Sequence, residues 1–122
     1  MNIQHLHLHV RDRSVSEAFY QEWLGMRVAR RGECLTFMTD GAEFDLALMQ
    51  DAEAAPLPSW FHFGCKLPSA KEVEALHSKM VERGLAIAKT LCQGETLASF
   101  RVRDPDGHAI EIYWEQPGAP LD

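Results

Sequence analysis

The first regular segment of the chain reads IQHLHLHV at residues 3–10, with apolar and polar residues in alternation. A period of two is typical of a strand that has one apolar face. The apolar side chains would pack beneath a covering element, and His5, His7 and His9 would lie on the opposite face. The segment therefore predicts a half-buried strand that presents three imidazoles on its open side.

The same order of elements occurs twice, in about residues 1–50 and again in about residues 59–116, with a proline-containing linker at 51–58. In each half a strand and a helix precede three short strand-like runs. The six runs are at residues 26–30, 34–39, 44–49, 86–90, 97–103 and 109–114. We expect an α+β fold in which two β-α-β-β-β modules form a cupped mixed sheet with the helices on its outer face, all within a single domain of residues 1–122.

Both expected helices have sequence signals at their ends. SVSE at residues 14–17 and SAKE at residues 69–72 have the form of a capping box. Gly25 and Gly84 are placed to take the left-handed conformation that ends a helix. These signals predict where each helix starts and stops.

Strand parity also assigns faces in the second half. Packing of the phenylalanines that flank His62 places this histidine on the open face, and packing of the isoleucines that flank Glu111 does the same for Glu111 and Tyr113. An odd-length loop with a bulge in the last hairpin would put Arg101 on that face as well. The alternations thus predict a common hollow lined by ligand-type side chains.

Two neutral imidazoles and one carboxylate, from His5, His62 and Glu111, can hold a divalent metal and leave positions open to a substrate. Fe, Mn, Zn and Ni are all compatible with this donor set. A histidine on a strand is often only a hydrogen-bonded structural residue. An inward glutamate without a partner, however, carries a desolvation cost, which favours the metal interpretation for the three residues together.

Four further residues are candidates on the same faces. His7 or Tyr113 could transfer a proton, and His7 is favoured over His9 because it is nearer to His5; the alternatives are solvent contact at the rim for the histidines and a cavity wall for the tyrosine. Arg101 and His9 are candidates for substrate binding. Arg101 would anchor an anionic group, or would instead form a structural ion pair with a neighbouring acid.

The other two histidines and the three cysteines are not candidates for the metal site. His77 on the second helix and His108 in the last turn are expected to be solvated. Cys34, Cys65 and Cys92 are odd in number and lack C-x-x-C spacing, which fits buried reduced thiols better than a disulfide framework.

The composition limits the class of partner. The formal net charge is −6, with acidic residues scattered along the chain, which argues against a nucleic-acid or anionic-membrane partner and favours a small molecule. No apolar run approaches the roughly 20 residues that span a bilayer. We expect a cytoplasmic protein.

Several short motifs together resemble the vicinal oxygen chelate superfamily, which includes glyoxalase I, extradiol dioxygenases, fosfomycin-resistance enzymes and bleomycin-resistance proteins. They run in order over nearly the whole chain: QHL at 4–6, FY at 19–20, LG at 24–25, HFG at 62–64 and DPDGH at 104–108, ahead of Glu111. The resemblance implies paired modules, a homodimer, and a divalent metal held by the residues that match His5, His62 and Glu111. It further implies a metal-dependent enzyme with a lyase, isomerase or oxygenase step on a small oxygen-chelating substrate; the alternative is a non-catalytic, drug-sequestering protein.

The chain departs from particular members of that family. Extradiol dioxygenases usually have a tyrosine where this chain has Arg101 and a catalytic histidine where it has Ala47, which argues against ring cleavage. Glyoxalase I adds a carboxylate from the first half, for which Asp45 is the candidate. The phosphonate-binding residues of fosfomycin enzymes are not found after Glu111.

Overall fold

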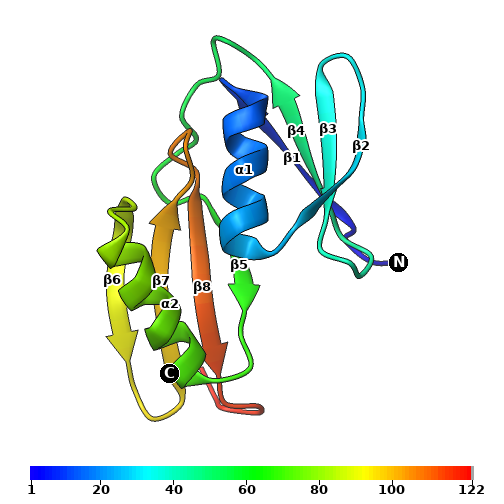
Figure 1. Ribbon diagram of the computed structural model, residues 1–122. Helices are drawn as coiled ribbons and strands as arrows, with labels where there is room; N and C mark the ends of the chain where they lie inside the picture. The colour runs from blue at the N-terminus through cyan, green and yellow to red at the C-terminus, as the bar shows by residue number, and fades with distance from the viewer. Residues whose placement is uncertain (122) are drawn as a thin grey trace. The chain divides into compact units, whose positions relative to one another are not determined.

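The computed structural model describes residues 1–121, which form two copies of the order β-α-β-β-β (Figure 1). The chain divides into two compact units, residues 1–56 and 57–122, and the boundary lies in the proline-containing linker. The predicted α+β class and the predicted element order are confirmed, and element ends differ from the sequence prediction by only a few residues.

The first unit contains one four-stranded mixed sheet with the order β1-β4-β3-β2. Strands β1 and β4 are parallel, and the other pairs are antiparallel. Helix α1 lies against β2 and β4 (Figure 1). The elements are β1 His5–Val10, α1 Arg13–Leu24, β2 Arg27–Arg31, β3 Leu35–Thr39 and β4 Asp45–Gln50.

The second unit repeats this topology with the order β5-β8-β7-β6. Strands β5 and β8 are parallel, and β8-β7 and β7-β6 are antiparallel. Helix α2 lies against β6, β7 and β8. The elements are β5 His62–Lys66, α2 Ala70–Glu82, β6 Ile87–Gln93, β7 Leu97–Arg103 and β8 Ala109–Glu115.

Each unit has its own apolar core between sheet and helix. Burial alternates along β1, along β3 and over residues 110–113 of β8, as the parity argument requires. The central strands β4 and β7 each have three consecutive buried residues, at 46–48 and 98–100. The fully buried large side chains include Tyr20, Met38, Leu46 and Leu48 in the first unit and Val73, Met80, Phe100, Val102, Ile110 and Ile112 in the second.

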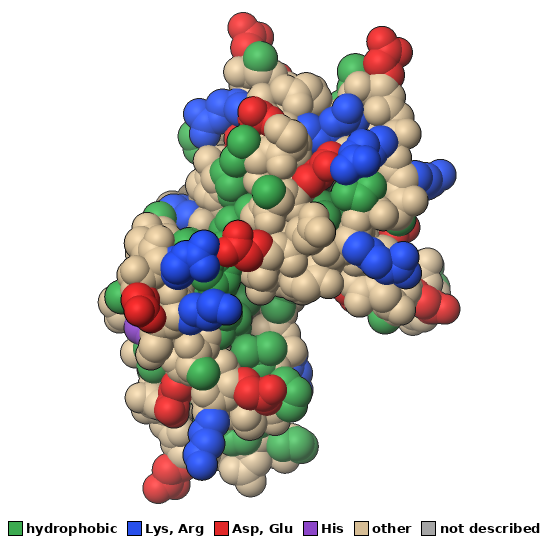
Figure 2. Space-filling model, viewed as in Figure 1, with side chains coloured by type: hydrophobic (Ala, Val, Ile, Leu, Met, Phe, Trp, Pro, Cys, Tyr) green, Lys and Arg blue, Asp and Glu red, His purple; other side chains and the backbone are tan. Residues whose placement is uncertain are grey.

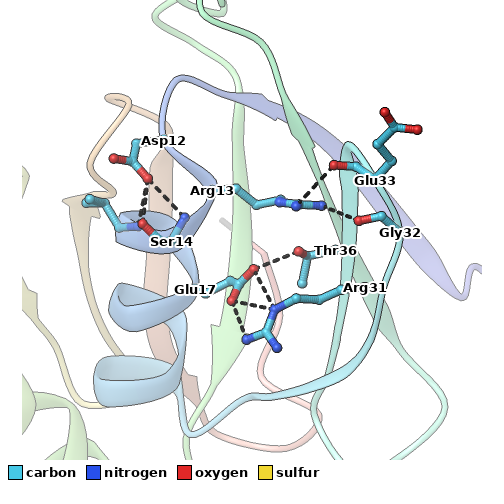
Figure 3. A network of polar contacts seen from close by, with 9 residues as sticks. Asp12, Arg13, Ser14, Glu17, Arg31, Gly32, Glu33 and Thr36 are labelled. Carbon is cyan, nitrogen blue, oxygen red and sulfur yellow. Dashed lines mark hydrogen bonds and ion pairs between the residues drawn. The ribbon is translucent and has the colours of Figure 1, made fainter.

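The predicted capping box of the first helix is wrong. The N-cap is Asp12, whose carboxylate accepts hydrogen bonds from the backbone N–H groups of Ser14 and Val15 and from the Ser14 hydroxyl (Figure 3). The Ser14 hydroxyl bond, with the backbone bonds, lowers the pKa of the Asp12 carboxyl. Asp12 lies two residues before Ser14 in the chain, so the helix starts two residues earlier than the box implied.

Glu17, the other residue of that expected box, turns toward the sheet instead. Its carboxylate accepts two hydrogen bonds from Arg31 Nε at 3.1 and 3.3 Å, one from Arg31 Nη2 at 2.7 Å, and one from the hydroxyl of buried Thr36 at 2.6 Å (Figure 3). These contacts, led by the Arg31 hydrogen bond, lower the pKa of Glu17. The residue joins α1 to β2 and β3.

The second helix begins as predicted. The hydroxyl of the N-cap, Ser69, accepts from the backbone N–H of Glu72. Gly84 follows the helix with a φ of 77°, and Gly25 ends the first helix with a φ of 66°. Both glycines occupy the left-handed region that their positions require.

Charged side chains of both signs are interspersed on the face shown in Figure 2. This agrees with the scattered acidic residues of the sequence. Among residues 1–121, no helix has both the length and the apolar character needed to cross a membrane.

Candidate functional site

The three histidines of β1 lie on the polar face of their sheet. His5, His7 and His9 are exposed and alternate with the buried side chains of Leu8 and Val10. Strand pairing sets His5 beside Asp45, the candidate extra carboxylate, on the neighbouring strand β4. Because paired residues share a face, an imidazole and a carboxylate lie next to each other in this unit.

His9 has a specific partner within the first unit. Its Nδ1 donates to the Asp51 carboxylate at 2.8 Å, and this hydrogen bond lowers the pKa of Asp51. The His7 and His9 rings are 5.3 Å apart between centroids. His9 therefore has an acidic neighbour that would compete with an anionic ligand.

In the second unit, His62 and Glu111 come together on the open face of the sheet. Gly64 pairs with Glu111 across the parallel strands β5 and β8, which sets His62 one pleat away from the glutamate on the same face. His62 Nε2 is 3.7 Å from Glu111 Oε2, and the two side chains are about 30% exposed. The separation exceeds a hydrogen bond, so the two atoms face each other without being bonded.

Both side chains are oriented by a hydrogen bond at their far atom. His62 Nδ1 lies 3.1 Å from the backbone carbonyl oxygen of Trp60. A carbonyl only accepts, so Nδ1 carries a proton, and in the neutral ring Nε2 then keeps its lone pair. Ser99 donates its hydroxyl to Glu111 Oε1 at 2.9 Å and leaves Oε2 directed at His62.

This is the arrangement that metal-binding histidines and carboxylates commonly have, with the second atom of each group held by a neighbouring acceptor or donor. Two ligands that are each about 2.0–2.2 Å from an ion are at most about 4.4 Å apart. The observed separation of 3.7 Å allows both atoms to reach one ion. The donor set of the second unit therefore fits a divalent metal.

Arg101 lies beside this pair. It pairs directly with Glu111 across β7 and β8. Residues 104–108 connect these strands, so the loop has the odd length that the predicted pairing requires. Its Nη2 is 3.4 Å from His62 Nε2. Its Nε is buried and has no hydrogen-bond partner among the residues that the structure describes. The site thus contains a cation whose hydrogen bonds are incomplete.

Tyr113 lies over Gly64 on the same face. A Cβ atom added to Gly64 would be 3.1 Å from Tyr113 Cε1, closer than nine in ten real Cβ contacts. The tyrosine ring thus uses the space that a larger residue on β5 would fill. Ser99 pairs with Tyr113 across the antiparallel strands, so the ring, the hydroxyl and the carboxylate of Glu111 are neighbours.

A third group of ligand-type atoms occurs in the last turn, at Asp104, Asp106 and His108, whose candidate atoms lie within 4.8 Å of one another. Asp104 accepts from the backbone N–H groups of Asp106 and His108 and from His108 Nδ1 at 2.7 Å. The expectation that His108 is solvated is wrong: it is 5% exposed. Asp104 and His108 bond each other and the loop backbone, which explains the cluster as a structural turn.

His77 is also less solvated than expected. Its ring is half-buried and lies edge-on against Phe100, with centroids 4.9 Å apart. The α2 surface therefore uses this histidine as part of its packing against β7.

The three cysteines are free thiols, but the expectation that they are buried is wrong. Cys34 and Cys92 are exposed, and Cys65 is half-buried.

The model of the Glyoxalase/Bleomycin resistance protein/Dioxygenase superfamily matches residues 2–112. The chain belongs to this superfamily. The match spans both units and includes His5, His62 and Glu111.

Curated members of the superfamily are related at modest identity. Catechol-2,3-dioxygenase of Bacillus subtilis is 29% identical over 95% of this chain, which spans only 42% of the dioxygenase. An uncharacterized protein of Pseudomonas aeruginosa is 28% identical over 97% of the chain and 91% of its own length.

Solved structures from the superfamily share the fold. A structure described as a possible glyoxalase from Bacillus cereus has a TM-score of 0.80 and 28% identity, and the match covers 92% of this chain and 97% of that one. The trypanothione-dependent glyoxalase I of Leishmania major has a TM-score of 0.74 and 26% identity over 92% of this chain and 85% of its own. The superfamily thus contains enzymes of both the glyoxalase and the dioxygenase type.

Proposed function

We propose that the protein is a metal-dependent enzyme of the glyoxalase/dioxygenase type that acts on a small oxygen-chelating substrate. The observation that carries the proposal is the convergence of His62 Nε2 and Glu111 Oε2 at 3.7 Å, each oriented by a hydrogen bond at its other atom. Such preparation of two donor atoms is expected of ligands and is not needed for packing.

His62 and Glu111 are the proposed metal ligands, and His5 is the predicted third ligand. Fe, Mn, Zn and Ni suit this donor set. Asp45, which pairs with His5, is the candidate for a fourth ligand. When bound, a divalent ion supplies Lewis acidity that stabilises negative charge on substrate oxygen atoms.

The chain's own side chains supply proton transfer and binding. Tyr113 and His7 are the candidates for moving a proton, because each lies on the polar face of its sheet and has a titratable atom. Arg101, with its unpartnered Nε, is the candidate anchor for an anionic substrate group. His9 would contact substrate only in competition with Asp51. In this proposal the two units act as one domain, and the protein is a homodimer.

One observation favours a second candidate function, a binding protein that sequesters a small molecule without metal chemistry. Arg101 donates toward the same nitrogen of His62 that a metal would use. The guanidinium in that position can compensate the negative charge of Glu111 in place of a metal ion. The superfamily name includes bleomycin resistance proteins, which makes this class relevant.

Metal content separates the two functions. The purified protein is incubated with Fe²⁺, Mn²⁺, Zn²⁺ or Ni²⁺, dialysed, and analysed by mass spectrometry, beside His62→Ala and the control His77→Gln. An enzyme of the proposed kind retains one ion per chain in the wild type and the control and none in His62→Ala. Equal metal content in the wild type and both variants, or no metal in any of these three proteins, would contradict the proposal. Oxygen uptake with catechols and isomerisation of hemithioacetals then distinguish the reaction types.

A further inference from the structure

Arg101 and a metal ion would use the same lone pair. His62 Nδ1 donates to the Trp60 carbonyl, so the only acceptor on the ring is Nε2. Arg101 Nη2, which can only donate, is 3.4 Å from that atom. A metal ligated by Nε2 replaces this contact, because one lone pair cannot serve both.

The charges on this face make the competition stronger. Across the sheet, Lys89 pairs with Arg101, Arg101 with Glu111, and Glu111 with Gly64. This row has two cations and one acid. A divalent ion beside Glu111 would therefore meet the repulsion of Arg101 directly and of Lys89 from one strand further away.

The hydrogen bonding of the Arg101 side chain is incomplete. Its Nε is buried without a hydrogen-bond partner among the described residues, and a buried donor in that state is unfavourable. Moving the side chain away from His62 breaks the 3.4 Å contact between Arg101 Nη2 and His62 Nε2 and breaks no hydrogen bond at Arg101 Nε. Displacement of the guanidinium is thus a feasible step.

We propose that Arg101 is a gate for the metal site: its guanidinium occupies the His62 lone pair in the metal-free protein and must move before an ion binds. The inference rests on the proposed function and adds a regulatory residue to it. Arg101 lowers the affinity for metal and makes occupancy depend on where its side chain lies.

The test compares Arg101→Met with Arg103→Met. Methionine keeps a long side chain and removes every donor. Arg103 is on the same strand and the same face, but its Nη1 is held by the carbonyl of Gly107 at 3.0 Å, so its replacement removes the same charge without touching His62. Affinity for Zn²⁺ is measured by isothermal titration calorimetry in all three proteins. We expect Arg101→Met to bind at least about tenfold more tightly than the wild type, and Arg103→Met to lie within about threefold of it.

A metal-free measurement tests the contact itself. The ¹⁵N resonance of His62 Nε2, recorded without metal, should move toward that of an unbonded imidazole nitrogen in Arg101→Met and stay in place in Arg103→Met. An unchanged resonance in Arg101→Met would overturn the gate.

The outcomes separate the two proposals. If the wild type binds Zn²⁺ through His62 and Arg101→Met binds it no more tightly, the gate is wrong and the proposed function stands. If neither protein binds Zn²⁺ through His62, the metal-dependent function fails and the gate fails with it. Equal strengthening in Arg101→Met and Arg103→Met would reduce the effect to general electrostatics and refute the gate.

Discussion

Replacing Glu17 with leucine should destabilise the first unit mainly through Thr36. The Thr36 hydroxyl is fully buried and donates to Glu17 at 2.6 Å. Without that acceptor, a buried donor is left unpaired, which costs about 1–3 kcal/mol. The lost pairing with Arg31 adds little, because the Arg31 side chain is 58% exposed and its charge is screened by water. We therefore expect Glu17→Leu to lower the free energy of unfolding by about 1–3 kcal/mol.

The assay is urea unfolding followed through amide resonances of residues 1–56, so that the first unit is observed by itself. Thr36→Val in the Glu17→Leu background removes the stranded hydroxyl and should restore part of the loss. Arg31→Met is the matched control and should be milder than Glu17→Leu. The reasoning is refuted if Glu17→Leu is no more destabilising than Arg31→Met. It is also refuted if Thr36→Val lowers the free energy of unfolding of the Glu17→Leu protein by as much as it lowers that of the wild type.

Three further predictions concern acid stability, the tyrosine of the site and the last turn. The Arg31 hydrogen bond lowers the pKa of Glu17 below 4.5. The ionised Glu17 carboxylate therefore contributes its full stabilisation above pH 4.5, and this contribution is lost as the pH falls through the lower pKa of the folded state. In urea titrations over that acid range, Glu17→Gln should lose less stability than the wild type. Gly64→Ala should displace the Tyr113 ring by a few tenths of an ångström, seen as shifted ring resonances with nearly unchanged unfolding, and unshifted resonances would show that the ring does not lie over the glycine. Asp104→Ala should lower the free energy of unfolding by about 1–3 kcal/mol in thermal unfolding, because it removes an acceptor shared by two hydrogen bonds of a buried turn. A loss below about 0.5 kcal/mol, the usual limit for surface changes, would contradict that role.

The repeated fold was predictable because its signals are local. Alternation in β1 fixes which face each histidine takes, and the same rule applies to His62 on β5 and Glu111 on β8. The Arg101–Glu111 register followed from the length of a single loop. Each of these inferences needs only neighbouring residues, so the chain order was sufficient.

The contacts that finish the site could not be predicted in the same way. The roles of the Trp60 carbonyl and of Ser99 depend on distances between strands, which the sequence does not contain. Glu17 shows the same limit: its spacing from Ser14 suits a capping box, yet a buried hydroxyl and an arginine from other strands hold it. His108 was misjudged because its turn is polar in sequence but covered in the fold.

The central claim is that His62 and Glu111 bind one divalent ion, and anomalous diffraction locates such an ion directly. Crystals grown with Zn²⁺ are measured on both sides of the zinc absorption edge. We expect an anomalous peak about 2.0–2.2 Å from both His62 Nε2 and Glu111 Oε2, with Arg101 moved away from the histidine. A peak at the Asp104–His108 turn instead, or none beside His62 and Glu111, would contradict the account.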